Sequence, residues 1–73
     1  MISLLVKGNR EQALSAARSR KIQVRTVLER TSARTETILH CSSLDSPSVI
    51  RWYCEDPGDA PFPPGTLMHY SEI

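Results

Sequence analysis

Apolar and polar positions follow different periods along this 73-residue chain, and each period predicts one element. Residues 2–7 form a short apolar run that ends at a glycine, which is typical of a buried strand. In residues 10–20, alanine and leucine recur at helical spacing on an otherwise polar segment. Asn9 is a good N-cap, and Gln12 stands at the capping-box position three residues later. We therefore expect a strand followed by a helix.

The segment 21–30 has period two, which indicates a strand with one face in the core. The face expected to be buried carries Ile22, Val24, Thr26 and Leu28. After a polar loop, the Thr- and Ile-rich residues 35–41 are the expected antiparallel partner. We predict that the core includes Leu14, Val24, Leu28 and Leu39.

Residues 47–54 allow two interpretations. Pro47 suits the first turn of a helix, and Asp45 or Ser46 can cap it. The β-branched and aromatic residues in 49–54 favour a strand instead. We prefer a short helix whose buried face carries Val49, Ile50, Tyr53 and Cys54. Trp52 then points away from the core and is a candidate surface residue.

Residues 56–65 hold four of the five prolines and form no regular structure, because proline lacks an amide donor. We expect a proline-rich acidic loop with Phe62 folded back onto the domain, then a closing strand over 66–70. The expected order is β-α-β-β-α-β in a single domain, 1–73. This is the split βαβ or ferredoxin-like pattern of the α+β class, a small antiparallel sheet with helices on one face.

Charge is divided unevenly along the chain. Eight of the nine Lys and Arg residues stand in 1–34 with only two acids, whereas 35–73 holds six acids and one arginine. Such asymmetry indicates a charged partner. It loses this meaning if strands from the two halves alternate in the sheet and the charges neutralise one another locally. Both interpretations stay open at this point.

Neither a metal site nor a disulfide is expected. The opening MISLLVKG has too few apolar residues for a signal peptide or a membrane span, so we expect a reducing cytoplasm and free, buried thiols. A zinc set could be drawn from His40, Cys41, Cys54 and His69. No two of these residues have zinc-finger spacing, and neighbours on a strand point to opposite faces.

We also expect no catalytic residue and no cofactor. Cys54 is followed by Glu55 and Asp56, and negative charges beside a thiol oppose its use as a nucleophile. The same acids and Asp59 have no nearby base or ligand set. A phosphate-binding glycine pattern is missing from the sequence. The chain is therefore expected to bind a partner as a monomer, without chemistry of its own.

The partner contacts are expected on a basic surface from the first helix and the strand after it, with the surface tryptophan. The candidate residues are Lys7, Arg10, Arg18, Arg20, Lys21, Arg25 and Trp52. Basic residues can neutralise phosphates, so a nucleic-acid-binding module with weak backbone contact to DNA or RNA is the alternative. The aromatics do not interleave with the basic residues as stacking surfaces for single strands would.

Segments at the two ends of the chain resemble the sequences of a known family. They read MISLLVKGNREQALSAARSRK and RWYCEDPGDAPFPPGTLMHYSEI, and RWYCEDPGDAPFPPG is the only distinctive block. Over its whole length the chain resembles small phage-encoded transcription regulators that bind bacterial RNA polymerase, of the kind found in a lytic Xanthomonas phage. The distinctive block has no mechanism attached to it.

This resemblance implies a non-enzymatic inhibitor of host transcription in the cytoplasm of an infected bacterium. Such a protein binds the amino-terminal region of the largest polymerase subunit, prevents promoter recognition and suppresses termination. It has no catalytic residues to carry over, so it acts sterically and allosterically. The residues by themselves indicate a compact binding module and leave the partner open.

Overall fold

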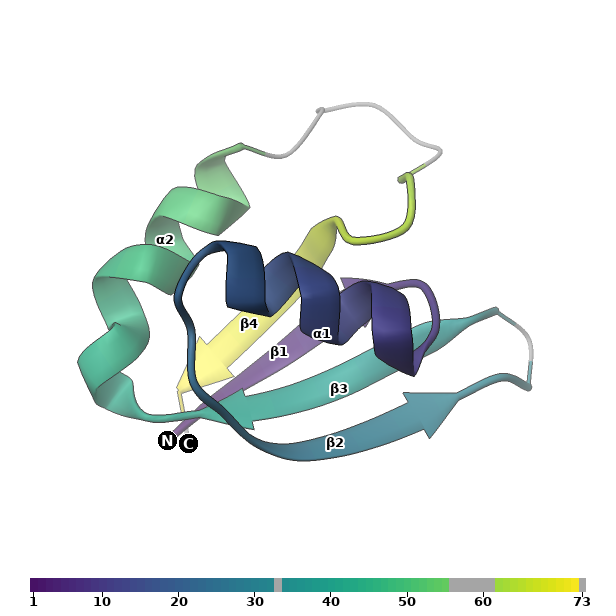
Figure 1. Ribbon diagram of the computed structural model, residues 1–73, viewed down its shortest axis with the longest axis horizontal. Coiled ribbons are helices and arrows are strands. Elements are labelled where there is room, and N and C mark those ends of the chain that lie inside the picture. The colour runs from purple at the N-terminus through teal and green to yellow at the C-terminus, as the bar shows by residue number, and fades with distance from the viewer. Residues whose placement is uncertain (33, 56–61, 73) are drawn as a thin grey trace.

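The structure is a computed structural model that describes residues 1–32, 34–55 and 62–72 (Figure 1). Its elements in chain order are β1 (Ile2–Lys7), α1 (Arg10–Ser19), β2 (Val24–Arg30), β3 (Glu36–Cys41), the 3-10 helix η1 (Ser43–Asp45), α2 (Ser46–Cys54) and β4 (Leu67–Glu72). The strands form one antiparallel sheet in the order β2-β3-β1-β4. The α+β class is confirmed, and the element order is the expected one apart from the inserted η1.

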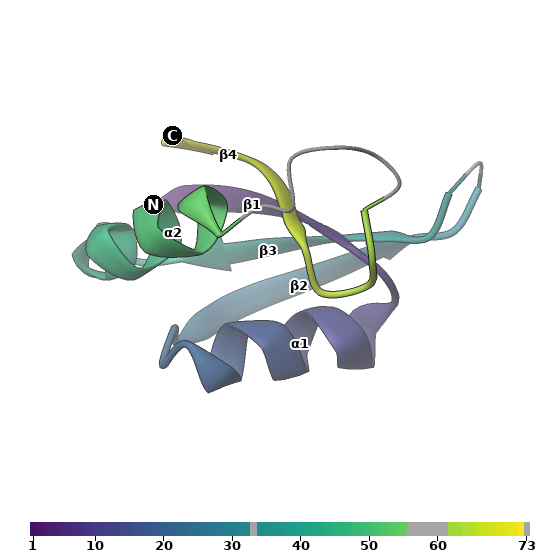
Figure 2. The same ribbon diagram turned by 90° about the horizontal axis from the view of Figure 1, so that it is seen from above.

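The core lies on one face of this sheet. On β1 every second side chain is fully buried, namely Ile2, Leu4 and Val6. Both helices contribute to the same cluster of buried residues, α1 through Ala13 and Ala17. Figure 1 shows α1 crossing in front of the sheet and α2 beside β4, and Figure 2 shows α1 lying on one side of the strands. The opposite face of the sheet is covered by no described helix.

Local signals set both ends of α1. The capping box is present, because the Gln12 N–H donates to Asn9 Oδ1 and the Asn9 N–H donates to Gln12 Oε1, each at 2.9 Å. At the other end Lys21 adopts a left-handed conformation with φ of 61°. The Ile22 N–H then reaches the Ala17 carbonyl at 3.1 Å, which is the bond pattern of a Schellman motif. The helix therefore stops before Ile22, which turns into the core.

The expected burial along residues 21–30 holds for Ile22 and Val24 but is wrong for Thr26 and Leu28, because the strand contains a bulge. Val24 pairs with Cys41 and Val27 pairs with Leu39, so the register shifts between Val24 and Thr26 and leaves one extra residue, Arg25. Val24 and Val27 therefore share the core-facing side although they are three residues apart. Thr26 is exposed, and Leu28 is 58% exposed on the opposite face. Of the other predicted core residues, Leu39 is fully buried, and Leu14 and Val24 are half-buried against the cluster.

The helix predicted near residues 47–54 is confirmed, but its buried face is not the expected one. Val49 and Trp52 are buried, whereas Ile50, Tyr53 and Cys54 are exposed. Trp52 is 2% exposed, so the expectation that it faces solvent is wrong. A buried indole contributes more apolar area than the alternative side chains, and its burial rotates the helix about its axis. Tyr53 instead packs edge-on against Tyr70, with ring centroids 5.2 Å apart.

The chain enters β4 through a tight contact with the end of β1. The Gly65 N–H donates to the Lys7 carbonyl at 2.7 Å, and the Lys7 N–H donates to the Thr66 carbonyl at 2.9 Å. Gly65 has φ of 90°, which favours glycine. Most of the expected proline-rich loop, 56–61, lies outside the described residues, and Phe62 is half-buried. Among the described residues no helix is long and apolar enough to cross a membrane.

Candidate functional site

A groove runs between α1 and β2, the two basic elements of the first half of the chain. Its volume is about 430 Å³. Six of its lining residues come from the two elements: Arg10, Leu14 and Arg18 from α1, and Val24, Arg25 and Val27 from β2. The α1 residues are four apart, so they lie along one stripe of the helix. We call this feature the arginine groove.

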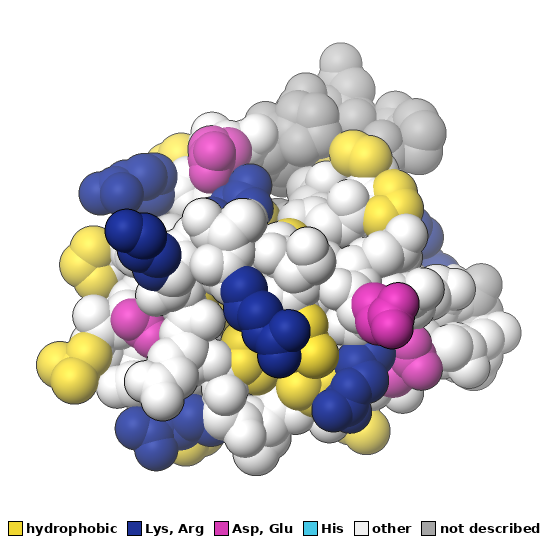
Figure 3. Space-filling model, viewed as in Figure 1, with side chains coloured by type: hydrophobic (Ala, Val, Ile, Leu, Met, Phe, Trp, Pro, Cys, Tyr) yellow, Lys and Arg dark blue, Asp and Glu magenta, His cyan; other side chains and the backbone are white. Residues whose placement is uncertain are grey.

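The arginine groove combines an apolar floor with a basic rim. Leu14, Val24 and Val27 are half-buried and pack against the core cluster, whereas Arg10, Arg18 and Arg25 are exposed. Figure 3 shows apolar surface opening below α1 with Lys and Arg side chains beside it. Apolar surface flanked by arginine is the composition of a protein contact, since arginine and buried apolar groups dominate binding energy at interfaces.

The rim arginines carry no ion pair within the part of the chain that the structure describes. The single ion pair there joins Arg20 to Glu55. Glu29 lies near the groove, but its carboxylate accepts the Arg10 backbone N–H at 2.7 Å, at the first turn of α1. An anionic carboxylate there also interacts favourably with the helix dipole. Among the described residues, no acidic side chain pairs with the guanidinium groups of the rim, so their donors can meet a partner.

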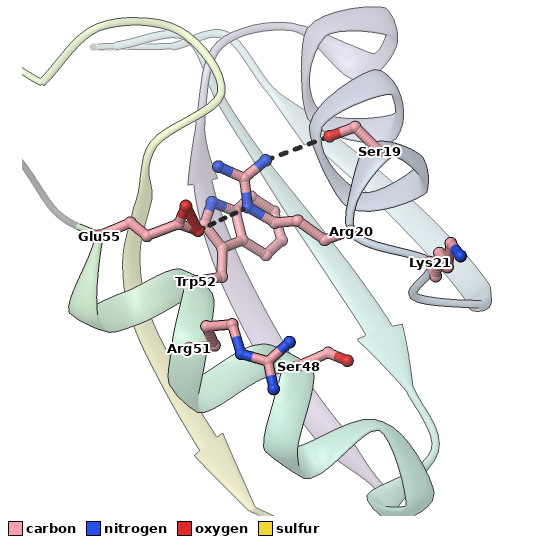
Figure 4. A pocket seen from close by; sticks show the side chains of 7 residues that line it. All are labelled: Ser19, Arg20, Lys21, Ser48, Arg51, Trp52 and Glu55. Carbon is pink, nitrogen blue, oxygen red and sulfur yellow. Dashed lines mark hydrogen bonds and ion pairs between the residues drawn. The ribbon is translucent and has the colours of Figure 1, made fainter.

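Two predicted site residues, Arg20 and Trp52, contact each other where the end of α1 meets α2. The Arg20 guanidinium lies over the Trp52 ring, 4.9 Å from its centroid, and its Nε is 3.4 Å from Glu55 Oε1 without hydrogen-bond geometry. Arg20 Nη1 also donates to the Ala16 carbonyl at 3.0 Å. We call Arg20, Trp52 and Glu55 the α1–α2 clamp, because they fasten the end of α1 to α2 (Figure 4). Cation–π contacts of this kind contribute about 0.5–2 kcal/mol.

The α1–α2 clamp borders a depression of about 390 Å³. Lys21 and Arg51 also line it, yet the labelled side chains do not converge on one point (Figure 4). Lys21 is exposed and points away from the others. Lys7 is half-buried, lies on β1, pairs in register with Glu36 on β3 and does not line the arginine groove. The structure thus brings Arg10, Arg18 and Arg25 together and separates Lys7, Arg20, Lys21 and Trp52 from them.

The histidines and cysteines do not gather into a site. In the described residues no group of three or more His, Cys, Asp or Glu side chains is placed to hold a metal ion. His40 Nδ1 shares a 2.6 Å hydrogen bond with the Thr26 hydroxyl, while its neighbour Cys41 is buried in the core. Both cysteines are free, but Cys54 is exposed, contrary to expectation. Burial raises the pKa of the Cys41 thiol; nearby Asp45 raises it further, and the N-terminal ammonium lowers it.

Sequence reasoning found the rim of the groove and missed its floor. The three arginines stand out as a cluster of charge, whereas the floor depends on the bulge at Arg25. The only signal for that bulge was the spacing of Val24 and Val27, which share a face only if one residue between them is extra.

Comparison with known proteins adds no relative: no family model, no curated protein and no solved structure matches this chain.

Proposed function

We propose that this chain is a non-enzymatic regulator that binds bacterial RNA polymerase through the arginine groove. The resemblance described above supplies the partner, the amino-terminal region of its largest subunit, and the place of action, the cytoplasm of an infected bacterium. In this proposal the bound chain prevents promoter recognition and suppresses termination. It acts as a wedge that shifts the polymerase between functional arrangements.

One observation carries the binding role: three exposed arginines without ion pairs among the described residues surround an apolar floor. Arginine meets carboxylates through two parallel hydrogen bonds, which gives orientation as well as attraction. The apolar floor of Leu14, Val24 and Val27 supplies the desolvated centre that a stable protein contact needs. A charged phosphate backbone gains no binding energy from apolar side chains. The groove therefore favours a protein partner over the nucleic-acid alternative.

The test is capture of purified bacterial RNA polymerase by tagged variants of the chain. The groove variant carries Arg10→Glu, Arg18→Glu and Arg25→Glu. The control variant carries Arg30→Glu, Arg34→Glu and Arg51→Glu, three exposed arginines outside the groove lining, so both variants have the same net charge. We expect the groove variant to lose about a hundredfold or more in affinity and the control to stay within about threefold.

Each variant is first shown to be folded by its amide NMR spectrum. Arg20 is left unchanged because its contacts with Trp52 and Glu55 hold the fold. Equal loss in both variants would indicate general electrostatic attraction and would contradict binding through the arginine groove. No capture by the parent chain would show that the polymerase is not the partner.

A further inference from the structure

We propose that the arginine groove accepts an extended acidic segment of the partner, which pairs with the free edge of β2 as a fifth strand of the sheet. This inference rests on the proposed function for the partner's identity. It goes beyond that function in stating what kind of segment binds and which atoms hold it.

The edge of β2 is open. In the sheet order β2-β3-β1-β4, β2 pairs with β3 on one side only. Among the described residues no other backbone group is hydrogen-bonded to the β2 backbone. Figure 1 shows β2 as the outermost strand, with no element beyond it. Such an edge presents unpaired N–H and C=O groups that can pair with another strand.

The arginine groove lies directly beside this edge. Val24 and Val27 on β2 face the same side as α1, and Leu14 of α1 lies across the groove from them. A strand paired with β2 places every second side chain on that side of the sheet. Those side chains would cover the three half-buried floor residues. One extended segment can therefore both pair with the β2 backbone and cover the apolar floor.

The dimensions of the groove suit a short strand. From Arg10 to Arg18 the helix rises about 12 Å, at 1.5 Å per residue. An extended chain covers that distance in about four residues, of which two direct side chains into the groove. These two side chains lie between arginines from α1 and β2. A segment with apolar residues at its groove-facing positions over the floor, and acidic residues at the next groove-facing positions on either side, matches the floor and the rim together.

The rim arginines, including the bulge residue Arg25, favour an acidic partner over a second copy of this chain. Bulges usually protect an edge from pairing with other chains. Here the bulge is confined to the start of β2, between Val24 and Thr26, and the rest of the strand keeps a regular register with β3. The extra residue is Arg25, which lines the groove. A second copy would bring three more rim arginines against the first three, and Glu29 is already occupied by the Arg10 N–H.

The test is residue-resolved hydrogen exchange of the chain, free and bound to intact bacterial RNA polymerase. The β2 amides that exchange quickly in the free chain are those directed to the open edge. Binding should slow this set by about tenfold or more. The fast-exchanging amides of β4, the other outer strand of the sheet, are the matched control and should keep their rates.

The outcomes separate this inference from the proposed function. If no complex forms, the proposed function fails. If a complex forms and the β2 edge amides are not slowed, the partner docks through side chains alone, for example as a helix, and the fifth strand is wrong. Equal slowing at β2 and β4 would mean general stabilisation of the fold and would also overturn the proposal. Protection of β2 in concentrated free protein would show that the added strand comes from a second copy, which again contradicts an acidic partner segment.

Discussion

Leu28 and Leu39 are the same residue type on paired strands, and they test how much stability depends on the observed register. Leu39 is 0% exposed on β3, whereas Leu28 is 58% exposed on β2. We expect Leu39→Ala to lower the free energy of unfolding by about 2–5 kcal/mol, because it empties a packed site. Leu28→Ala should change it by about 0.5 kcal/mol or less. Urea unfolding of both variants measures this difference. Equal losses would mean that β2 has no bulge and that strict alternation holds.

Cys41 gives the fold a pH dependence above neutrality. Its thiol pKa is raised, first by burial and then by Asp45. The unfolded chain therefore ionises this thiol at a lower pH, near the usual value of about 8.5, than the folded chain does. Stability from Cys41 is intact below that value and is lost as the pH rises toward the folded pKa.

Cys41→Ala should reduce this alkaline loss of stability, although it also lowers stability at pH 7 by removing a packed side chain. Cys54→Ser is the control, because Cys54 is exposed and outside the core. The measurement is the free energy of unfolding of parent and variants between pH 7 and pH 10. If the parent and Cys41→Ala lose stability in parallel over that range, the thiol is not the cause.

At the scale of elements, the features that could be predicted are those whose cause lies within a few residues. The capping box of Asn9 and Gln12 starts α1, and the apolar run of β1 is bounded by its own turn. The bulge in β2 and the rotation of α2 depend on what packs against them. Trp52 is buried because Arg20 and the core meet it from other elements, and no pattern within α2 contains that information. The same holds for the candidate site. Its rim arginines could be predicted from the sequence, whereas its apolar floor could not, because the floor depends on the bulge in β2.

The left-handed residue at the end of α1 leads to a stabilising substitution. Lys21 occupies, with φ of 61°, the position of a Schellman motif that glycine prefers. Lys21→Gly should raise the free energy of unfolding by up to about 1 kcal/mol, since the left-handed conformation costs about 1–2 kcal/mol in other residues and glycine loses part of that gain as entropy. Thermal unfolding measures the change. Lys21→Ala is the control, because it removes the ammonium group but keeps the Cβ, and it should give no gain.

At the scale of the whole molecule, the two oppositely charged halves interleave only in part. The sheet order alternates strands from the first and second halves, β2-β3-β1-β4, so opposite charges mix there, as in the pairing of Lys7 with Glu36. The corner formed by α1 and β2 comes entirely from the basic half. This corner holds the arginine groove, so the charge asymmetry of the sequence survives folding at one place.

The response to salt distinguishes the two classes of partner that this basic corner could meet. If its three arginines contacted phosphates, affinity would fall about 500-fold for a tenfold rise in salt, because each phosphate contributes a log–log slope of about 0.9. A protein partner seated on the apolar floor should lose about tenfold or less over the same range, mostly through slower association. The measurement is the affinity for polymerase, and separately for duplex DNA, between about 50 and 500 mM salt. The function would be nucleic-acid binding if polymerase and DNA showed the same steep slope, and if that slope became shallow in the groove variant but not in its control.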